Sequence, residues 1–266
     1  MMGHLDSRKR LLSDLADYIA TEDNPSDFPL NLALIAENEG LTYSLGDYED
    51  YFDGLLEYDS GHFHIFLNGH GKYSIDTPRI RFSFAHELGH YFIDEHRHVL
   101  ESGISLHIPS RYLLEQKDPV EKEADYFASC LLMPESVFCQ KSAGKFSYQR
   151  ISDLQSIFGT SLSATLIRYM QIGSYPICVI MTKDGVIRHK WFSDDFPFKN
   201  LKTDYRNTVP KYTCAGDYPN NQYDQTEAVE VSSWFRSYDD LTGLSINEHC
   251  IYPTRGFDTI SILWFD

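Results

Sequence analysis

The sequence predicts an α+β fold in which a helix-rich part ends near residue 173 and a smaller β-rich part follows. In the first part, apolar residues recur at helical spacing, as they do in the segment 8–20. In the second part, the apolar and β-branched segments 175–181 and 186–192 flank a Lys-Asp-Gly turn, which is typical of a β-hairpin. This change of pattern places a boundary near residue 173.

The first part is expected to combine helices with one hairpin. Helical periodicity, proline at a first turn and glycine or proline after a last turn predict helices at 8–20, 30–38, 78–95, 119–133, 151–158 and 163–171. Strands are predicted at 55–58 and 62–67 because an Asp-Ser-Gly turn separates two segments of strand character. Helices and strands are therefore mixed within one part of the chain, as the α+β class requires.

The second part is expected to consist mainly of strands. Beyond the hairpin, apolar and β-branched residues predict strands at 228–232 and 259–265. Residues 197–225 are rich in Pro, Asn, Asp and Tyr, and we expect them to form a loop.

The charge of the chain argues against two classes of function. Its 266 residues include 39 Asp and Glu against 23 Lys and Arg, a formal net charge of −16. Lys and Arg supply the affinity of proteins for nucleic acids and anionic lipid surfaces, so we expect neither to be the main partner. No apolar run approaches the roughly 20 residues that span a bilayer. The 42% of hydrophobic residues suffice for a buried core.

The cysteines and the first residues predict a cytoplasmic protein. There are five cysteines, an odd number, and no two have the C-x-x-C spacing of a zinc knuckle. The first ten residues lack the apolar stretch of a signal peptide. We therefore expect free thiols and a cytoplasmic location.

A metal-binding motif lies in the predicted helix 78–95. His86 and His90 are four residues apart, so their side chains share one helix face and can bind one metal ion. Glu87 lies about 100° further around the helix and can reach a water molecule in an open coordination position. This is the H-E-x-x-H arrangement. The alternative is a buried helix whose histidines form hydrogen bonds and bind no metal.

His96 is one candidate for the third protein ligand that a catalytic zinc ion requires. It completes the histidine spacing of the metzincins, which have glycine at a sharp turn three residues after the second histidine. In this sequence the position is Ile93, and a β-branched residue does not favour such a turn. We therefore expect His96 to be a surface histidine.

The predicted helix 119–133 offers a better third ligand. Glu121 and Asp125 are four residues apart and share a face. A glutamate ligand followed by an aspartate that holds a zinc-bound imidazole is a sensible arrangement. The spacing favours Glu121 over Glu123, which stays open as an alternative. An ordinary solvated acidic helix start would suit Glu123 better.

The two helices together resemble the ImmA/IrrE family of metallopeptidases. The matching stretches are RIRFSFAHELGH at 79–90 and EKEADYFASCLLMP at 121–134. The resemblance implies a zincin-like minimal metallopeptidase with a gluzincin-like ligand set, in which one zinc ion is held by His86, His90 and Glu121. It also implies Glu87 as general base and Asp125 beside a ligand. The implied substrates are helix-turn-helix transcriptional repressors, whose cleavage releases stress-response genes or mobile elements.

We expect three parts along the chain. Residues 1–140 are expected to form the zincin-like metallopeptidase domain, 141–173 a helix-turn-helix-like helical segment, and 174–266 a β-rich C-terminal domain for sensing or docking. We do not expect the helical segment to bind DNA, because Arg168 is the only basic residue of its second helix. The alternative function is a non-proteolytic, metal-dependent sensor or a regulator that binds DNA or protein. The sequence leaves the oligomeric state open.

A peptidase site also needs a strand that holds the substrate and a group that stabilises the oxyanion, and the sequence offers candidates for both. The strand 62–67 is a candidate edge strand that holds the substrate extended, and a half-buried strand without this role is the alternative. The residue that stabilises the oxyanion is left open among Tyr91, His107 and Tyr112, because no motif selects one.

Overall fold

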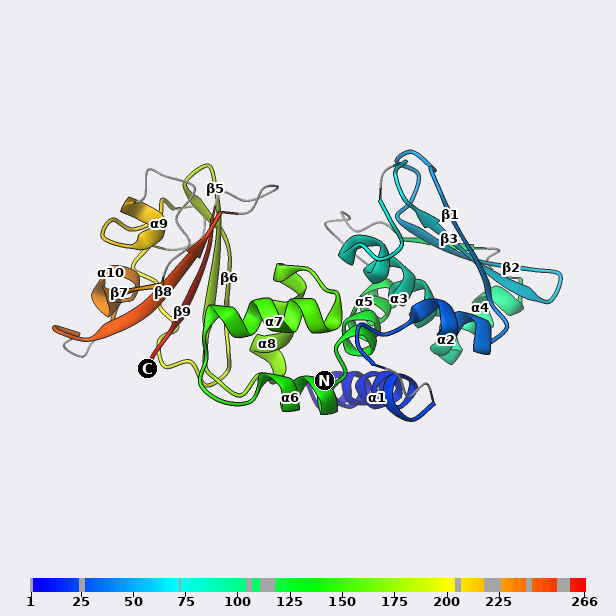
Figure 1. The fold of residues 1–266 in the computed structure, drawn as a ribbon, viewed down its shortest axis with the longest axis horizontal. Coiled ribbons are helices and arrows are strands. Elements are labelled where there is room, and N and C mark those ends of the chain that lie inside the picture. Colours follow the sequence, from blue (N-terminus) through cyan, green and yellow to red (C-terminus); the bar gives the residue numbers. More distant parts are fainter. Residues whose placement is uncertain are drawn as a thin grey trace. The chain divides into compact units, whose positions relative to one another are not determined.

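Two sheets, each with its own helices, organise the chain (Figure 1). The computed structural model describes residues 2–23, 27–71, 73–103, 107–110, 118–203, 207–217, 226–237, 241–252 and 259–266. Contacts group Met1–Lys141 with Ile151–Thr165 in a first unit, and Ser142–Arg150 with Leu166–Asp266 in a second. Helices and strands occur in both units, so the α+β class is confirmed.

The sheet of the first unit has the strand order β1-β3-β2-β4. β3 pairs in parallel with β1 and antiparallel with β2, and β4 pairs antiparallel with β2. The predicted hairpin is confirmed as β2 and β3, whereas the short strands β1 and β4 were not predicted. The strands span Thr42–Gly46 (β1), Gly54–Asp59 (β2), His62–Asn68 (β3) and His107–Ser110 (β4).

β3 lies inside this sheet rather than at its edge. The strand has hydrogen-bonding neighbours on both sides, so its backbone groups cannot also hold an extended substrate. The expectation that 62–67 is an edge strand is therefore wrong. Among the described residues, the two edges of the sheet are β1 and β4.

Seven helical segments of the described chain precede residue 143. They are α1 (Met2–Tyr18), the π-helix η1 (Ile19–Asp23), α2 (Leu32–Asn38), α3 (Pro78–Phe92), α4 (Asp94–Glu101), α5 (Pro119–Leu132) and α6 (Glu135–Ser142). Pro78 and Pro119 stand at the first turns of their helices, as predicted. None of the helices in the described part of the chain is long and apolar enough to cross a membrane.

α3 and α5 approach each other closely at Gly89. A Cβ atom at this position would lie 3.1 Å from Phe127 Cδ1 and 3.4 Å from the Cα of Ala124. Glycine in a helix interior costs about 1 kcal/mol relative to alanine, and the close contact of the two helices offsets that cost. The side chains on the facing sides of α3 and α5 are thereby brought within reach of each other.

The predicted helix 78–95 is interrupted at Ile93. This residue has an extended backbone with ψ of 106°, so α3 ends and α4 begins at Asp94. Asp94 and Glu95 form an acidic first turn for α4, which the helix dipole favours. The interruption lets the residues after Ile93 turn back toward α3.

The helix pair expected around residue 160 is confirmed. It consists of α7 (Tyr148–Phe158) and α8 (Leu162–Ile172). Gly159 lies between them with φ of +63°, a left-handed conformation that glycine adopts without strain. In the first unit, the Phe158 ring contacts Phe28 and Phe138, with centroids 5.1 and 5.5 Å away.

The second unit is built on an antiparallel sheet of order β6-β5-β9-β8-β7. Its strands are β5 (Cys178–Lys183), β6 (Val186–Phe192), β7 (Thr226–Glu230), β8 (Ser245–Ile251) and β9 (Thr259–Trp264). Two short helices, α9 (Cys214–Asp217) and α10 (Val231–Trp234), accompany the sheet. Its hydrophobic core includes Trp234, Phe196 and Phe235. The predicted hairpin and the strands near 228 and 259 are confirmed, whereas β8 was not predicted.

Candidate metal centre

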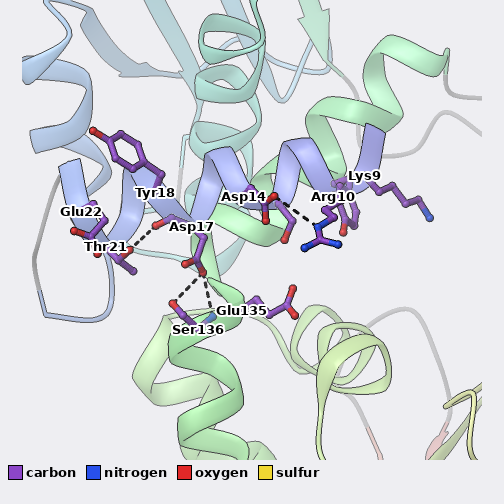
Figure 2. A pocket seen from close by; sticks show the side chains of 11 residues that line it. Lys9, Arg10, Asp14, Asp17, Tyr18, Thr21, Glu22, Glu135 and Ser136 are labelled. Carbon is purple, nitrogen blue, oxygen red and sulfur yellow. Dashed lines mark hydrogen bonds and ion pairs between the residues drawn. The ribbon is translucent and has the colours of Figure 1, made fainter. Parts of the chain in front are cut away.

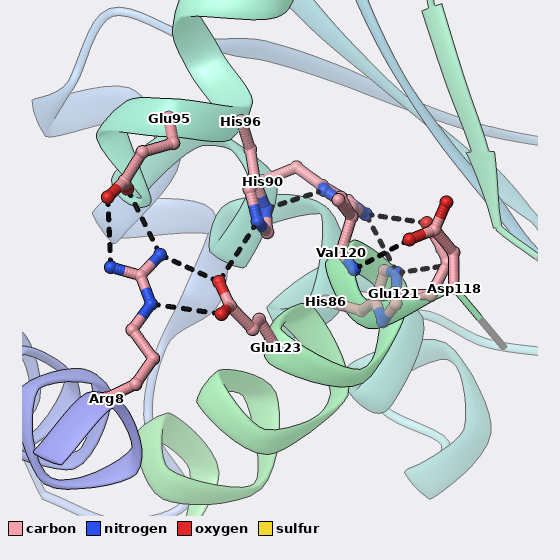
Figure 3. A network of polar contacts seen from close by, with 9 residues as sticks. All are labelled: Arg8, His86, His90, Glu95, His96, Asp118, Val120, Glu121 and Glu123. Carbon is pink, nitrogen blue, oxygen red and sulfur yellow. Dashed lines mark hydrogen bonds and ion pairs between the residues drawn. The ribbon is translucent and has the colours of Figure 1, made fainter. Parts of the chain in front are cut away.

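Three side chains with metal-binding atoms meet where α3 packs against α5. The binding atoms of His86, His90 and Glu121 all lie within 4.8 Å of one another. The two Nε2 atoms are 3.1 Å apart, and the Glu121 carboxylate oxygens lie 3.4 Å from His86 Nε2 and 3.3 Å from His90 Nε2. Both histidines are buried, and Figure 3 shows Glu121 beside them.

The spacing of these atoms fits a zinc ion. Tetrahedral bonds of about 2.0–2.1 Å to zinc place ligand atoms about 3.3–3.4 Å apart. The distances among the three side chains are 3.1 to 3.4 Å. Two imidazoles and one carboxylate are also the donor set of several catalytic zinc sites. The residues therefore fit the metal with little rearrangement.

Asp125 orients one of the two imidazoles. Its Oδ1 atom lies 3.0 Å from His86 Nδ1, and because a carboxylate only accepts hydrogen bonds, the Nδ1–H group must donate. A neutral His86 then keeps the lone pair of Nε2 directed into the cluster. This is the arrangement expected for a histidine ligand held by a carboxylate.

The metal-free cluster is strongly coupled electrostatically. Burial opposes a charge on His86, but hydrogen bonds to Asp125 and Glu121 outweigh it and raise the pKa of His86 to about 9. For His90, burial dominates and lowers the pKa. Burial alone would raise the pKa of Glu121, but its hydrogen bonds with the two histidines hold that pKa well below its usual range.

Glu87 lies against the first residue of β2. Its side chain is fully buried, and a Cβ atom on Gly54 would lie only 2.5 Å from Glu87 Oε1. The missing side chain of Gly54 therefore leaves the space that the Glu87 carboxylate occupies. Sequence reasoning missed Gly54, although glycine at a strand position can mark such a close approach.

His96 is buried, so the expectation of a surface histidine is wrong. Only 4% of the residue is exposed. The break at Ile93 turns α4 back, and His96 Nδ1 lies 3.1 Å from His90 Nδ1. His96 is not among the three residues whose binding atoms cluster. Burial, and next the neighbouring His90, lower the pKa of His96 to about 4.

Glu123 faces a different set of partners from Glu121. It accepts hydrogen bonds from Arg8 Nε at 3.0 Å and Arg8 Nη2 at 2.7 Å, and its Oε2 lies 3.4 Å from His96 Nε2. Arg8 also pairs with Glu95, at 3.0 and 3.1 Å (Figure 3). The hydrogen bond from Arg8 holds the pKa of Glu123 below its ordinary value. Of the two glutamates weighed from the sequence, Glu121 contacts both motif histidines and Glu123 contacts His96.

Tyr91, His107 and Tyr112 are the candidates for the donor that stabilises the oxyanion, and the described contacts assign this role to none of them. Tyr91 donates its hydroxyl hydrogen to Glu39 Oε2 at 3.2 Å, so this group is engaged at a different place. His107 belongs to β4, but its side chain and the whole of Tyr112 lie outside what the structure describes.

A separate pocket of about 950 Å³ is lined mainly by residues of α1 (Figure 2). Its walls also include Tyr126 of α5 and the first residues of α6. There Asp17 accepts hydrogen bonds from the backbone N–H and the hydroxyl of Ser136, at 3.1 and 3.0 Å. None of the metal-centre residues lines this pocket, and its Asp17–Ser136 contact serves to hold α1 against α6.

Comparison with known proteins identifies the domain that carries the cluster. Residues 58–170 match the sequence model of a peptidase family, described as the IrrE N-terminal-like domain of Peptidase_M78. The match over these residues agrees with the family resemblance of the two helices. The matched segment contains both histidines, Glu87 and Glu121. No curated protein sequence matches the chain.

A solved structure shares the fold over most of the chain. It is described as a Mycobacterium tuberculosis transcriptional regulator and superposes with a TM-score of 0.55 at 14% sequence identity. The match covers 96% of this chain and 74% of that one. At this identity the likeness concerns the fold alone.

Proposed function

We propose that this protein is a zinc-dependent endopeptidase that hydrolyses a peptide bond in a regulatory protein. The observation that carries the proposal is the grouping of His86, His90 and Glu121 at zinc-compatible distances, within a domain of a peptidase family. Those three residues hold one zinc ion, and Glu87 is the general base. Asp125 fixes the tautomer of His86.

The chemistry follows from what each side chain can do. A zinc ion in this site would lower the pKa of a water molecule and polarise the scissile carbonyl group. Glu87 accepts the proton of the attacking water and then passes it to the leaving amine nitrogen. Burial of its carboxylate between α3 and Gly54 keeps it in one position, which is what proton transfer over a hydrogen-bond distance requires.

We propose the outer edge of β4 as the place where the substrate lies. Ser110 of β4 stands opposite Gly54 in the sheet, and Gly54 is next to Glu87. A segment that adds to β4 as a further strand would therefore lie at the sheet edge nearer to Glu87, with β4 between it and Gly54. The backbone hydrogen bonds of such strand addition hold a peptide extended without demanding a particular sequence.

The class of substrate is proposed to be a helix-turn-helix repressor. The first support is the resemblance to the ImmA/IrrE family. The second is the net charge of −16, because an acidic surface attracts a basic partner and speeds its association. This attraction is screened by salt, so the cleavage rate is expected to fall as ionic strength rises. An unchanged rate across a wide salt range would contradict an electrostatic role.

We also propose a division of tasks along the chain. Residues 1–140 are the metallopeptidase domain, 141–173 a helix-turn-helix-like segment, and 174–266 a β-rich domain that senses a signal or docks the substrate. The support for the last part is that its sheet has a hydrophobic core of its own. A DNA-binding role of the helical segment has little support. Arg168, the basic residue of its second helix, is only 1% exposed and is not available to contact DNA.

The decisive test incubates the zinc-loaded protein with helix-turn-helix repressors encoded near its gene. Cleavage at one site is expected, and a chelator should stop it. Glu87→Gln should abolish cleavage and retain zinc, whereas Glu37→Gln, at an exposed position of α2, should cleave normally. Equal cleavage by Glu87→Gln would overturn the mechanism. Zinc-dependent capture of a repressor without cleavage would favour the sensor alternative.

A further inference from the structure

A chain of polar side chains, buried at His90 and His96 and half-buried at Glu123 and Arg8, leads away from His90 on the side opposite the metal cluster. His90 Nδ1 faces His96 Nδ1 at 3.1 Å, and His96 Nε2 faces Glu123 at 3.4 Å. Glu123 in turn accepts two hydrogen bonds from Arg8. Figure 3 shows these four side chains in sequence from α1 across α5 and α4 to α3. Within the described residues, His90 Nδ1 faces His96, whereas His86 Nδ1 faces the carboxylate of Asp125.

We propose that His96 is a positioning residue for His90, held in one tautomer by Glu123 and Arg8. The inference rests on the proposed metal site, because it concerns how one of its ligands is prepared. His96 does not itself contact the metal position. We refer to Arg8, Glu123, His96 and His90 as the His90 relay.

The Glu123 carboxylate determines which atoms donate and which accept along the His90 relay. The Glu123 carboxylate is paired with the Arg8 guanidinium and can only accept, so His96 Nε2 carries a hydrogen atom. A neutral imidazole has one N–H group, and His96 Nδ1 therefore offers a lone pair. This lone pair accepts the hydrogen of His90 Nδ1.

This arrangement leaves the Nε2 atom of His90 free of hydrogen at the metal position. With its single hydrogen on Nδ1, His90 presents the bare lone pair of Nε2, 3.1 Å from His86 Nε2 and 3.3 Å from Glu121. A metal ion needs this lone pair. Asp125 sets the same tautomer for His86 directly, so the two ligands are prepared in the same way by different partners. Replacing either partner is expected to weaken the metal site.

The relay also connects α1 to the metal centre. Arg8 joins Glu123 on α5 to Glu95 on α4, and its side chain is 24% exposed. The match to the peptidase family begins at residue 58, so Arg8 is supplied by a segment that precedes the matched domain. We infer that α1 supports zinc binding through Arg8, although His86, His90 and Glu121 all lie on other helices.

The test measures zinc affinity by competition with a chromophoric chelator at fixed pH, using the full chain. His96→Leu keeps an apolar filling but removes both nitrogen atoms, and it should weaken zinc binding 10- to 100-fold, as loss of a ligand's hydrogen-bond partner does. His96→Gln should stay within about threefold of the parent protein, because its oxygen accepts from His90 while its NH₂ donates to Glu123. The exposed His98, also on α4, is the control, and His98→Leu should have no effect.

Arg8 provides an independent variant that leaves both histidines intact. Arg8→Gln should weaken zinc binding about three- to tenfold, by analogy with other outer partners of a ligand. Arg10→Gln is the matched control on α1, where the side chain is 85% exposed and pairs only loosely with Asp14 at 3.9 Å. Nitrogen-15 NMR of the zinc-loaded protein should show the hydrogen of His90 on Nδ1, and this signal should change in His96→Leu.

The outcomes separate this inference from the proposed function. If the parent protein fails to bind zinc, or His86→Ala leaves binding unchanged, the proposed metal centre is wrong. If His86→Ala loses zinc but His96→Leu and Arg8→Gln bind as tightly as the parent, the centre stands and the relay is overturned. Equal losses in His96→Leu and His96→Gln would overturn the hydrogen-bond account. Circular dichroism confirms that each variant is folded before its affinity is compared.

Discussion

Replacing Gly54 with alanine should impair catalysis and leave zinc binding intact. The new Cβ atom would lie 2.5 Å from Glu87 Oε1, 3.0 Å from its Cγ and 3.1 Å from its Cδ. The whole end of the glutamate side chain is therefore in the way. Gly54 is not among the residues with positive φ, so its backbone accommodates alanine. It also belongs to β2, outside the group of proposed ligands.

The size of the effect can be worked out from the geometry. Ordinary contacts begin near 3.4 Å, so the Oε1 atom would have to retreat by about 0.9 Å. Glu87 is fully buried, and solvent offers it no space. β2 is held by β3 and β4 on its two sides, so the strand resists moving instead. A misplacement of about 1 Å costs roughly 100-fold in rate, which is about 2.7 kcal/mol of transition-state stabilisation.

The assay compares kcat for cleavage of the repressor substrate with zinc affinity from chelator competition. Gly54→Ala should lower kcat about 100-fold, with zinc bound as tightly as in the parent protein. An unchanged kcat in Gly54→Ala would show that the new Cβ atom does not displace the Glu87 carboxylate.

Three further outcomes are expected. Asp125→Ala should weaken zinc binding 10- to 100-fold, because His86 loses the partner of its Nδ1–H group; an affinity equal to the parent's would contradict this role. Zinc must displace a proton from His86, whose pKa is about 9 in the metal-free protein, so the logarithm of the apparent affinity should rise by about one per pH unit below pH 9. Chelator competition between pH 7 and 9.5 measures this slope, and a flat profile would argue against it. Gly89→Ala should lower the free energy of urea unfolding by about 1–3 kcal/mol, since its Cβ would meet Phe127 at 3.1 Å; unchanged stability would show that α3 and α5 separate easily.

Local patterns predicted the parts of the site that lie within one helix. The positions of His86, Glu87 and His90 follow from the period of the α-helix, which is the same wherever the helix packs. Proline at the first turns of α3 and α5 fixed where both helices begin. These features depend on neighbours a few residues away in the chain, so no knowledge of the tertiary structure was needed.

Strands were predicted only where the pattern was strong or a tight turn joined them. β2 and β3 were found from the turn between them, whereas β1, β4 and β8 were missed. β8 contains Glu248, and because glutamate is depleted in strands, its presence argues against a buried strand at this place in the sequence. Its carboxylate is nevertheless buried, where it accepts hydrogen bonds from Trp234 Nε1 at 2.9 Å and Ser261 Oγ at 3.0 Å. Those partners come from α10 and β9, and their convergence is not visible in the sequence of β8.

The sequence by itself determined the helical H-E-x-x-H motif, the second acidic helix and the α+β class. Only the tertiary structure decided which distant groups meet them. Arg8 and Glu123 are 115 residues apart, and Gly54 reaches Glu87 from another element. The burial of His96 likewise depends on the turn at Ile93 and on the helices that then cover it. Side-chain periodicity is a property of one element, whereas these contacts depend on how elements pack, and packing is set by the whole chain at once.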